Sequence, residues 1–208
     1  MLRSFIDAMD TEQIAAQVAR WARARQSRTV YFCNAHSVVT ANDDPRFAGV
    51  LDRADVAAPD GAPVAWMLRR LGHAGQPRVS GPDFMARLCA ELADSDVPVF
   101  LFGSTPETLE QLEHRLKAQF PGLRIAGAVS PPFGTVSPQA DALHVDHINR
   151  SGAGVVFVGL GCPKQETWCD QHRGQVHAVM LAVGAAFDFH AGTLKRAPHW
   201  MRALGLEW

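Results

Sequence analysis

The sequence of 208 residues has no long apolar run, no excess of charge of one sign and few cysteines. No run approaches the roughly 20 apolar residues that a membrane-spanning helix needs, and we expect no secretory signal at the start. The formal net charge of -1 provides no strongly basic face, so we expect no nucleic-acid partner. The four cysteines lie at irregular spacings, which predicts reduced thiols in a cytoplasmic protein.

Familiar cofactor and catalytic motifs are also missing. Gly159-Leu160-Gly161 lacks the third glycine of a dinucleotide fingerprint, and the sequence has neither a P-loop nor a G-x-S-x-G elbow. Cys162, Cys169 and His172 have six and two intervening residues, which fits no common zinc pattern. Asp94-Ser95-Asp96 has the D-x-D form of many metal-holding sugar transferases, but it precedes a strand and therefore predicts a solvated turn. We expect no metal site and no cofactor.

Two kinds of apolar segment alternate along the chain, whose hydrophobic content of 47% is ordinary for a globular protein. Short runs predict strands at 29–33, 55–58, 97–102, 124–129, 155–159 and 177–183. Helix signals predict helices at 11–24 and 106–119, helices that begin near residues 45, 62, 81, 139 and 164, and a last helix from 198. The remaining segments 73–80, 130–138 and 184–192 read as loops.

Alternation of strands and helices predicts a Rossmann-like α/β fold, with a mainly parallel sheet and helices on both faces. We treat residues 1–208 as one catalytic domain. The loop at 73–80 is a candidate divider between two closely packed lobes.

The strand at 155–159 is the clearest candidate for a ligand-binding element. It ends in Gly159-Leu160-Gly161, and Lys164, Gln165 and Glu166 follow in the first turn of a helix. A strand, a glycine turn and a helix N-terminus direct backbone N–H groups at an anion. The same pattern also fits an ordinary strand-to-helix loop with a charged turn, and spacing alone does not choose between the two.

Asp60 is the candidate general base, because it lies between Pro59 and Gly61 where a short strand gives way to a helix. The alternative for this carboxylate is a helix N-cap. Asn34 and His36 follow a comparable strand end, and could face the same crevice, although an asparagine there is often only a turn residue.

Basic residues near helix starts are candidates for binding phosphate. Arg78 precedes the helix that begins at Ser80-Gly81-Pro82-Asp83, and its guanidinium fork matches a phosphate if that helix start binds one. Lys195 and Arg196 form a small basic spot that could equally be solvated. Gly103-Ser104 is a further strand-to-helix turn, where we expect the serine to act as an N-cap.

Taken together, the motifs of the chain resemble the TagA/WecG/CpsF family of glycosyltransferases (glycosyltransferase family 26). The motifs occur in the family's order and cover nearly the whole chain: Asn34-Ala35-His36, Ala54-Asp55, Pro59-Asp60-Gly61, Arg78-Val79-Ser80-Gly81-Pro82-Asp83, Phe100-Leu101-Phe102-Gly103, Phe120-Pro121-Gly122, Gly159 to Glu166, Gly184-Ala185-Ala186-Phe187-Asp188, Lys195 to Trp200 and Gly205-Leu206-Glu207-Trp208.

The resemblance implies an inverting, metal-independent transfer from a UDP-sugar to an undecaprenyl-diphosphate-linked sugar, in bacterial cell-wall or surface polysaccharide synthesis. The transferred sugar would be of the N-acetylmannosamine type or a hexose. The resemblance places the enzyme in the cytoplasm, peripheral to the inner face of the membrane, and leaves a homo-oligomer open. By match, Asp60 corresponds to the catalytic base and Asn34 to a residue of its pocket. Gln165 corresponds to the nucleotide site and Arg78 to the diphosphate.

Two features depart from the family's pattern. Phe32 stands where many members have threonine, which removes a hydroxyl from the expected pocket. Members of the family continue past the Glu-Trp pair with a basic extension thought to close the site and touch the membrane, whereas this sequence ends at Trp208. Without that tail we expect a chain that favours the monomer, is weakly active or reaches a lipid acceptor poorly.

Two other functions stay open. One is a UDP-sugar-binding protein that is inactive without a tail or partner. The other is a nucleotide-dependent oxidoreductase, which the missing dinucleotide fingerprint disfavours.

Overall fold

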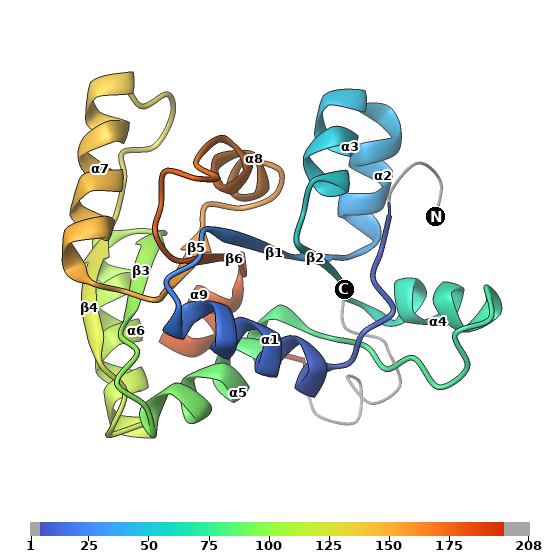
Figure 1. Cartoon of the computed structure of the whole chain (residues 1–208), viewed down its shortest axis with the longest axis horizontal. Helices are drawn as coiled ribbons and strands as arrows, with labels where there is room; N and C mark the ends of the chain where they lie inside the picture. Colours follow the sequence, from blue (N-terminus) through green and yellow to red (C-terminus); the bar gives the residue numbers. More distant parts are fainter. Residues whose placement is uncertain (1–4, 198–208) are drawn as a thin grey trace.

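The computed structural model describes residues 5–197, and its centre is one sheet of six parallel strands (Figure 1). The strands lie in the order β2-β1-β6-β5-β3-β4. Their bounds are Arg28–Cys33 (β1), Val56–Pro59 (β2), Val99–Gly103 (β3), Ile125–Val129 (β4), Val155–Gly159 (β5) and Val179–Ala182 (β6). The predicted Rossmann-like arrangement is therefore confirmed. All six strands join the same sheet, so the loop at 73–80 does not separate two sheets.

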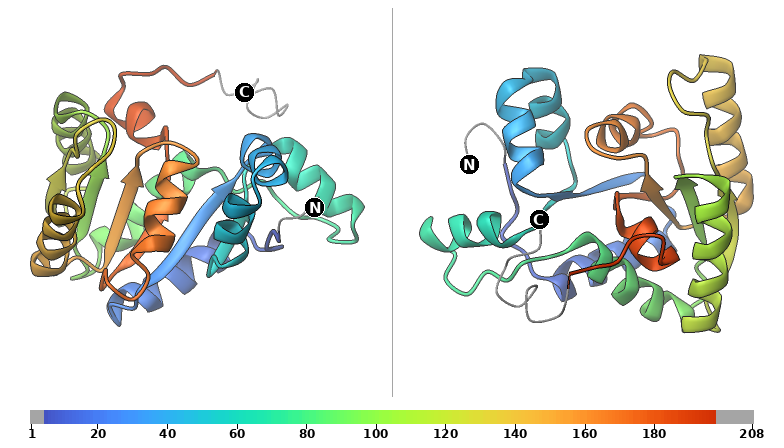
Figure 2. Two further views of the ribbon diagram at one scale, coloured as in Figure 1. Left: turned by 90° about the horizontal axis from the view of Figure 1, so that it is seen from above. Right: turned by 180° about the vertical axis from the view of Figure 1, so that it is seen from behind.

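Helices cover both faces of the sheet, as predicted (Figure 2). One face carries α1 (Thr11–Arg23), α5 (Gly81–Ala93), α6 (Pro106–Gln119) and α9 (Ala186–Ala191). The other carries α2 (Ala35–Asp43), α3 (Pro45–Asp52), α4 (Ala62–Arg70), α7 (Pro138–Ser151) and α8 (Lys164–Gln171).

Local sequence signals explain several of these elements. Asp10 and Gln13 form the capping box that the sequence predicted for α1, with the Asp10 carboxylate accepting from the Gln13 N–H at 2.8 Å. Asp44 caps α3, and Pro45 is its first residue. The central strands β3 and β6 are buried at every position, because helices on both faces exclude water from a parallel sheet.

At two places along the carboxyl edge of the sheet, two adjacent strands are followed by helices on opposite faces of the sheet. After β1 the chain enters α2 on one face, whereas after the adjacent β6 it enters α9 on the other. After β5 it enters α8, whereas after the adjacent β3 it enters α6 on the opposite face. Such divergence opens a crevice at the strand ends, which is where α/β proteins bind ligands.

Two local predictions were wrong, and one helix was not predicted. Residues 184–192 were expected to be a loop but contain α9, whose N-cap Ala185 provides no side-chain hydrogen bond. No helix was predicted between Asn34 and Asp44, but α2 lies there, and few of its residues are buried. Thr105, and not Ser104, is the N-cap of α6, and Ser104 has a positive φ of 57°. The helix expected from residue 198 lies outside the described residues.

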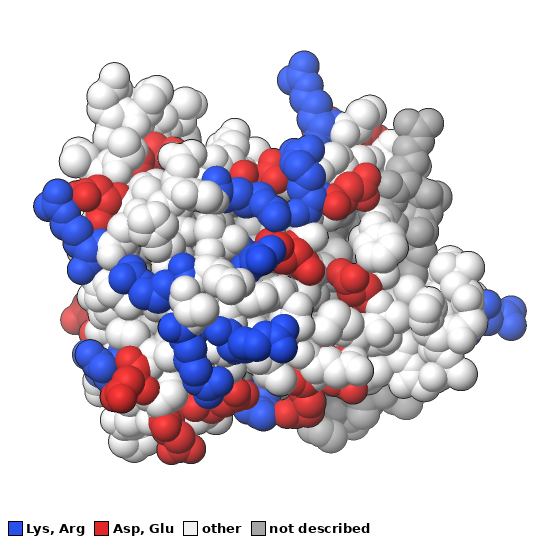
Figure 3. Space-filling view, viewed as in Figure 1, with Lys and Arg blue, Asp and Glu red and all other residues white. Residues whose placement is uncertain are grey.

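Surface charge agrees with the composition. Figure 3 shows lysine, arginine and acidic side chains intermingled over the face seen in Figure 1. Asp94 and Asp96 are exposed just before β3 begins, as expected of a solvated turn.

The cysteines are free thiols. Within residues 5–197, each helix is too short or too polar to pass through a bilayer.

Candidate functional site

Asn34 and Asp60 lie side by side because the register of β1 and β2 places them there. Cys33 and Pro59 are partners in the parallel pairing, and the chain continues from them into Asn34 and Asp60. The Asp60 N–H donates to the Cys33 carbonyl at 3.1 Å, which extends the pairing by one residue. The N-cap of α4 is Gly61, with a φ of 81° and no side-chain capping bond. The alternative that Asp60 caps this helix is therefore wrong.

Asn34 has the structural role of capping α2. Its Oδ1 accepts from the Ser37 N–H at 3.1 Å and from the Ser37 hydroxyl at 3.3 Å. His36 follows in the first turn of α2, where it is exposed to solvent and does not line the crevice that Asn34 and Asp60 share.

Asn34 and Asp60 open into a cleft of about 480 Å³ at the divergence of β1 and β6, which we call the Asp60 cleft. Five further residues predicted from the sequence line the same cleft: Arg78, Gly161, Gln165, Glu166 and Arg196. These residues come from the segments that follow β1, β2, β5 and β6, so the fold gathers at one place groups that are up to 162 residues apart, from Asn34 to Arg196.

Phe32, the residue found in place of threonine, forms part of the wall of this cleft. Its side chain is almost buried and its ring lies 5.1 Å from the ring of Phe84, measured between centroids. The wall is therefore apolar where a hydroxyl was expected from the resemblance.

In the turn after β5, Gly161 and Gln165 form hydrogen bonds with each other. Gly161 has a φ of 81°, which favours glycine. Its N–H donates to Gln165 Oε1 at 3.2 Å, and its carbonyl accepts from the Gln165 N–H at 3.0 Å. The Gln165 side chain therefore braces the turn, and the Gly161 N–H is occupied in this structure.

Glu166 is the most deeply buried carboxylate of the cleft, with 1% of the residue exposed. Its Oε1 accepts from Gln165 Nε2 at 2.9 Å, while its Oε2 has no hydrogen-bond partner among residues 5–197. Burial raises the pKa of Glu166, and the hydrogen bond from Gln165 opposes that rise. Burial also raises the pKa of the neighbouring Cys162 thiol to about 12, so this cysteine is not an activated nucleophile.

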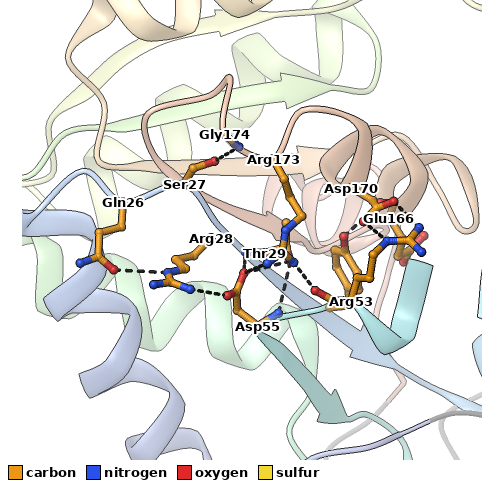
Figure 4. Close-up of polar contacts among 11 residues, drawn as sticks. Gln26, Ser27, Arg28, Thr29, Arg53, Asp55, Glu166, Asp170, Arg173 and Gly174 are labelled. Atoms are coloured by element: carbon orange, nitrogen blue, oxygen red, sulfur yellow. Dashed lines mark hydrogen bonds and ion pairs between the residues drawn. The ribbon is translucent and has the colours of Figure 1, made fainter. Parts of the chain in front are cut away.

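Helix α8 is fixed to the β1 side of the sheet by polar contacts (Figure 4). The Tyr31 hydroxyl donates to the Glu166 carbonyl at 3.2 Å, and Arg53 forms two hydrogen bonds to Asp170, at 3.0 and 2.6 Å. Asp55 lies at the amino end of β2, where it pairs with Arg28 at 2.7 Å. The Asp55 motif is therefore structural, at the opposite edge of the sheet from the cleft.

Asp83 positions the two arginines of the cleft. Arg196 pairs with it through two hydrogen bonds, at 2.6 and 3.2 Å, and Arg78 approaches it at 3.8 Å. Asp83 lies in the first turn of α5, where a carboxylate is favourable. The sequence offered a signal for this role, an acidic residue three positions after the Ser80 N-cap, but only the structure shows what it binds.

The other two predicted residues, Gly159 and Lys164, line a second cleft of about 460 Å³, which we call the Lys164 cleft. It lies where β3 and β5 diverge, and its wall is largely apolar, with Phe102, Phe133 and Trp168 among its lining residues. The turn from Gly159 to Gln165 separates the two clefts. Some of its residues, such as Gly159 and Lys164, line the Lys164 cleft, and others, such as Gly161 and Gln165, line the Asp60 cleft. Residues 5–197 contain no group of three or more His, Cys, Asp or Glu placed to hold a metal ion.

A parallel Rossmann-like sheet has two clefts at its carboxyl edge, and one of them holds the Asp60 and Glu166 carboxyl groups together with two arginines, at the strand ends where α/β proteins bind ligands. The family model "Glycosyl transferase WecG/TagA/CpsF family" matches residues 1–208, the whole chain, and the chain belongs to this family. It is therefore a glycosyltransferase of cell-wall or surface polysaccharide synthesis, with a sugar donor and an acceptor. This membership removes the oxidoreductase alternative.

Proposed function

We propose that the protein transfers a sugar from a UDP-sugar to an undecaprenyl-diphosphate-linked sugar at the inner face of the membrane. The transfer inverts the anomeric centre, requires no metal, and uses Asp60 as the general base. One observation carries the proposal: the Asp60 carboxylate shares a cleft of about 480 Å³ with the guanidinium groups of Arg78 and Arg196. A base in the cleft can accept the proton of an attacking hydroxyl, and the cations can stabilise the negative charge of a departing diphosphate.

In this proposal the reaction is a single displacement. Asp60 removes the proton of the acceptor hydroxyl as its oxygen bonds to the anomeric carbon, and the bond from that carbon to the diphosphate oxygen breaks. The electron pair leaves with UDP. Its growing negative charge is met by Lys164 on one side of the glycine turn, and by Arg78 and Arg196 on the other.

The two clefts divide the donor between them. The reacting sugar lies in the Asp60 cleft, the diphosphate crosses the turn between Gly159 and Gln165, and the uridine enters the Lys164 cleft. The apolar and aromatic wall of that cleft suits a flat base. Phe32 presents a ring, not a hydroxyl, to the sugar, which makes it a candidate determinant of donor choice.

The test measures UDP release from UDP-sugars and a short-chain lipid-diphosphate-linked GlcNAc analogue, in the presence of EDTA. Asp60→Asn keeps the shape of the side chain and removes the base, so turnover should fall about 10²- to 10⁴-fold. The matched control is Asp96→Asn, a change at an exposed aspartate before β3 that should leave turnover unaltered. Turnover unaffected by Asp60→Asn would refute Asp60 as the base, and loss of all activity in EDTA would refute the metal-independent route.

The alternative, a UDP-sugar-binding protein inactive without a tail or partner, predicts binding without UDP release. A screen of UDP-sugars by melting temperature separates the two, because a ligand that binds the folded state raises this temperature by mass action. The same screen identifies the sugar. A raised melting temperature with no UDP release from any acceptor would favour the binding protein.

A further inference from the structure

Helix α4 carries apolar side chains on both of its sides. Val64, Ala65 and Leu68 are buried against the sheet. On the outer side Trp66 is 50% exposed, Met67 39% and Leu71, just past the last helical residue, 60%. Large apolar side chains gathered on an outer surface indicate a contact with another body.

The charged residues of this helix, and of the chain that follows it as far as Asp83, are all arginines. No aspartate or glutamate occurs between Asp60 and Asp83, a segment that contains Arg69, Arg70 and Arg78, although the whole chain has a formal net charge of -1. Over α4, at the right of Figure 3, the surface shows blue and white and no red. The Arg70 guanidinium lies over the Trp66 ring, 5.4 Å from its centroid. Tryptophan, aliphatic side chains and arginine on one short helix match the headgroup region of a bilayer.

We propose that the outer side of α4, formed by Trp66, Met67, Arg69, Arg70 and Leu71, docks on the surface of an anionic lipid bilayer. With nine residues, α4 is about 14 Å long, so it can lie in the interface but cannot cross it. The positive charge of the arginines selects a negative surface, which a second copy of this chain, with mixed charges, does not offer as well.

The position of α4 in the chain connects membrane docking with the proposed transfer reaction. The helix begins at Ala62, two residues after Asp60, so a bilayer that contacts its outer side lies near the mouth of the Asp60 cleft. This connection rests on the proposed function, because it is the lipid-linked acceptor that must reach Asp60 from a membrane. Binding to lipid itself can be measured without any turnover.

The experiment is co-sedimentation of the full chain with vesicles of phosphatidylcholine alone or with phosphatidylglycerol. We expect binding only to the anionic vesicles. Trp66→Ser should weaken it about tenfold by removing buried apolar area, and Arg69→Gln or Arg70→Gln about fivefold each. The matched controls are Leu143→Ser on α7, where the leucine is 68% exposed, and Arg124→Gln, where the side chain is 60% exposed; both should bind as the unchanged protein does.

A second measurement places the tryptophan itself. Brominated lipid quenches the fluorescence of a tryptophan that enters the bilayer, and Trp66→Phe should lose the quenched component while the protein still binds. Equal weakening by Trp66→Ser and Leu143→Ser would overturn the proposal. So would the absence of vesicle binding together with a dimer, seen in sedimentation velocity, that Trp66→Ser converts to a monomer, because the occupant would then be a second copy.

Failure of this inference differs from failure of the proposed function. If the soluble acceptor is turned over but vesicle binding does not depend on α4, the docking surface is wrong and the enzyme stands. If vesicles bind through α4 but no UDP is released from any acceptor, the docking surface stands and the proposed transfer is wrong.

Discussion

Gly159, the last residue of β5, has no room for a side chain, and Gly159→Ala tests whether the residue serves packing or ligand contact. A Cβ at this position would lie 2.8 Å from Cδ2 and 3.0 Å from Cγ of Phe187, a ring that is fully buried. Overpacking of a buried ring costs about 1–3 kcal/mol. The lower entropy of the unfolded chain with alanine returns about 0.4–1 kcal/mol.

The net effect should be a loss of about 1–2 kcal/mol in the free energy of unfolding, or a fall of about 2–8 °C in melting temperature for a chain of this size. Thermal unfolding followed by circular dichroism measures it. Gly49→Ala is the matched control, because Gly49 lies within α3 and a Cβ there meets only the end of the Arg53 side chain, at 3.1 Å. This control should be neutral or stabilising by up to about 1 kcal/mol.

The two roles of Gly159 give opposite results. If position 159 requires glycine because of packing against Phe187, the variant has a lower melting temperature than the unchanged protein. An unchanged melting temperature, combined with loss of the stabilisation that UDP provides, would refute the packing argument and assign Gly159 to ligand contact.

Three further changes test neighbouring groups. Burial raises the pKa of Glu166, so the folded state holds this proton to higher pH than the unfolded state does. The free energy of unfolding therefore falls as pH rises above the ordinary glutamate range. Glu166→Gln should remove this fall, and the melting temperature of the variant relative to the unchanged protein should increase from pH 5 to pH 8. Asp83→Asn should alter stability by less than about 1 kcal/mol, because the Asp83 side chain is half-exposed. It should raise the KM for UDP-sugar severalfold by releasing Arg78 and Arg196, and an unchanged KM would contradict the positioning role. Lys164→Ala should weaken UDP binding in calorimetry about tenfold, as expected for loss of one charge-assisted contact of about 1.5 kcal/mol, and equal affinity would move the diphosphate away from the Lys164 cleft.

The fold was predictable because its strands and most of its helices have strong local signals. The capping box at Asp10 and the Asp44-Pro45 start are read directly from residue types, and both are confirmed. The short helix α9 was missed because its six residues give too little periodicity and its start has no capping side chain. At α6, Ser104 adopts a positive φ, and the cap falls on the next residue, Thr105; a choice between adjacent capping residues depends on backbone angles that the sequence does not encode locally.

The candidate site was predictable only in part. Asn34 was predicted to face the same crevice as Asp60, and the two residues adjoin because β1 pairs with β2, as consecutive strands commonly do. The separation of Lys164 from Gln165 into different clefts was not expected, since both belong to one helical turn. It depends on β5 lying between β3 and β6, and strand order is a property of long-range packing.

Because the chain diverges at two places on one edge, the walls of the two clefts come from different loops. The loops after β3 and β4 build the Lys164 cleft, whereas those after β1, β2 and β6 build the Asp60 cleft. Under the proposed division of the donor between the clefts, a substitution in one set of loops changes the part of the site that holds one half of the donor, and the residues that line the other part stay the same. Only the turn from Gly159 to Glu166 belongs to both, and a change there alters the two together.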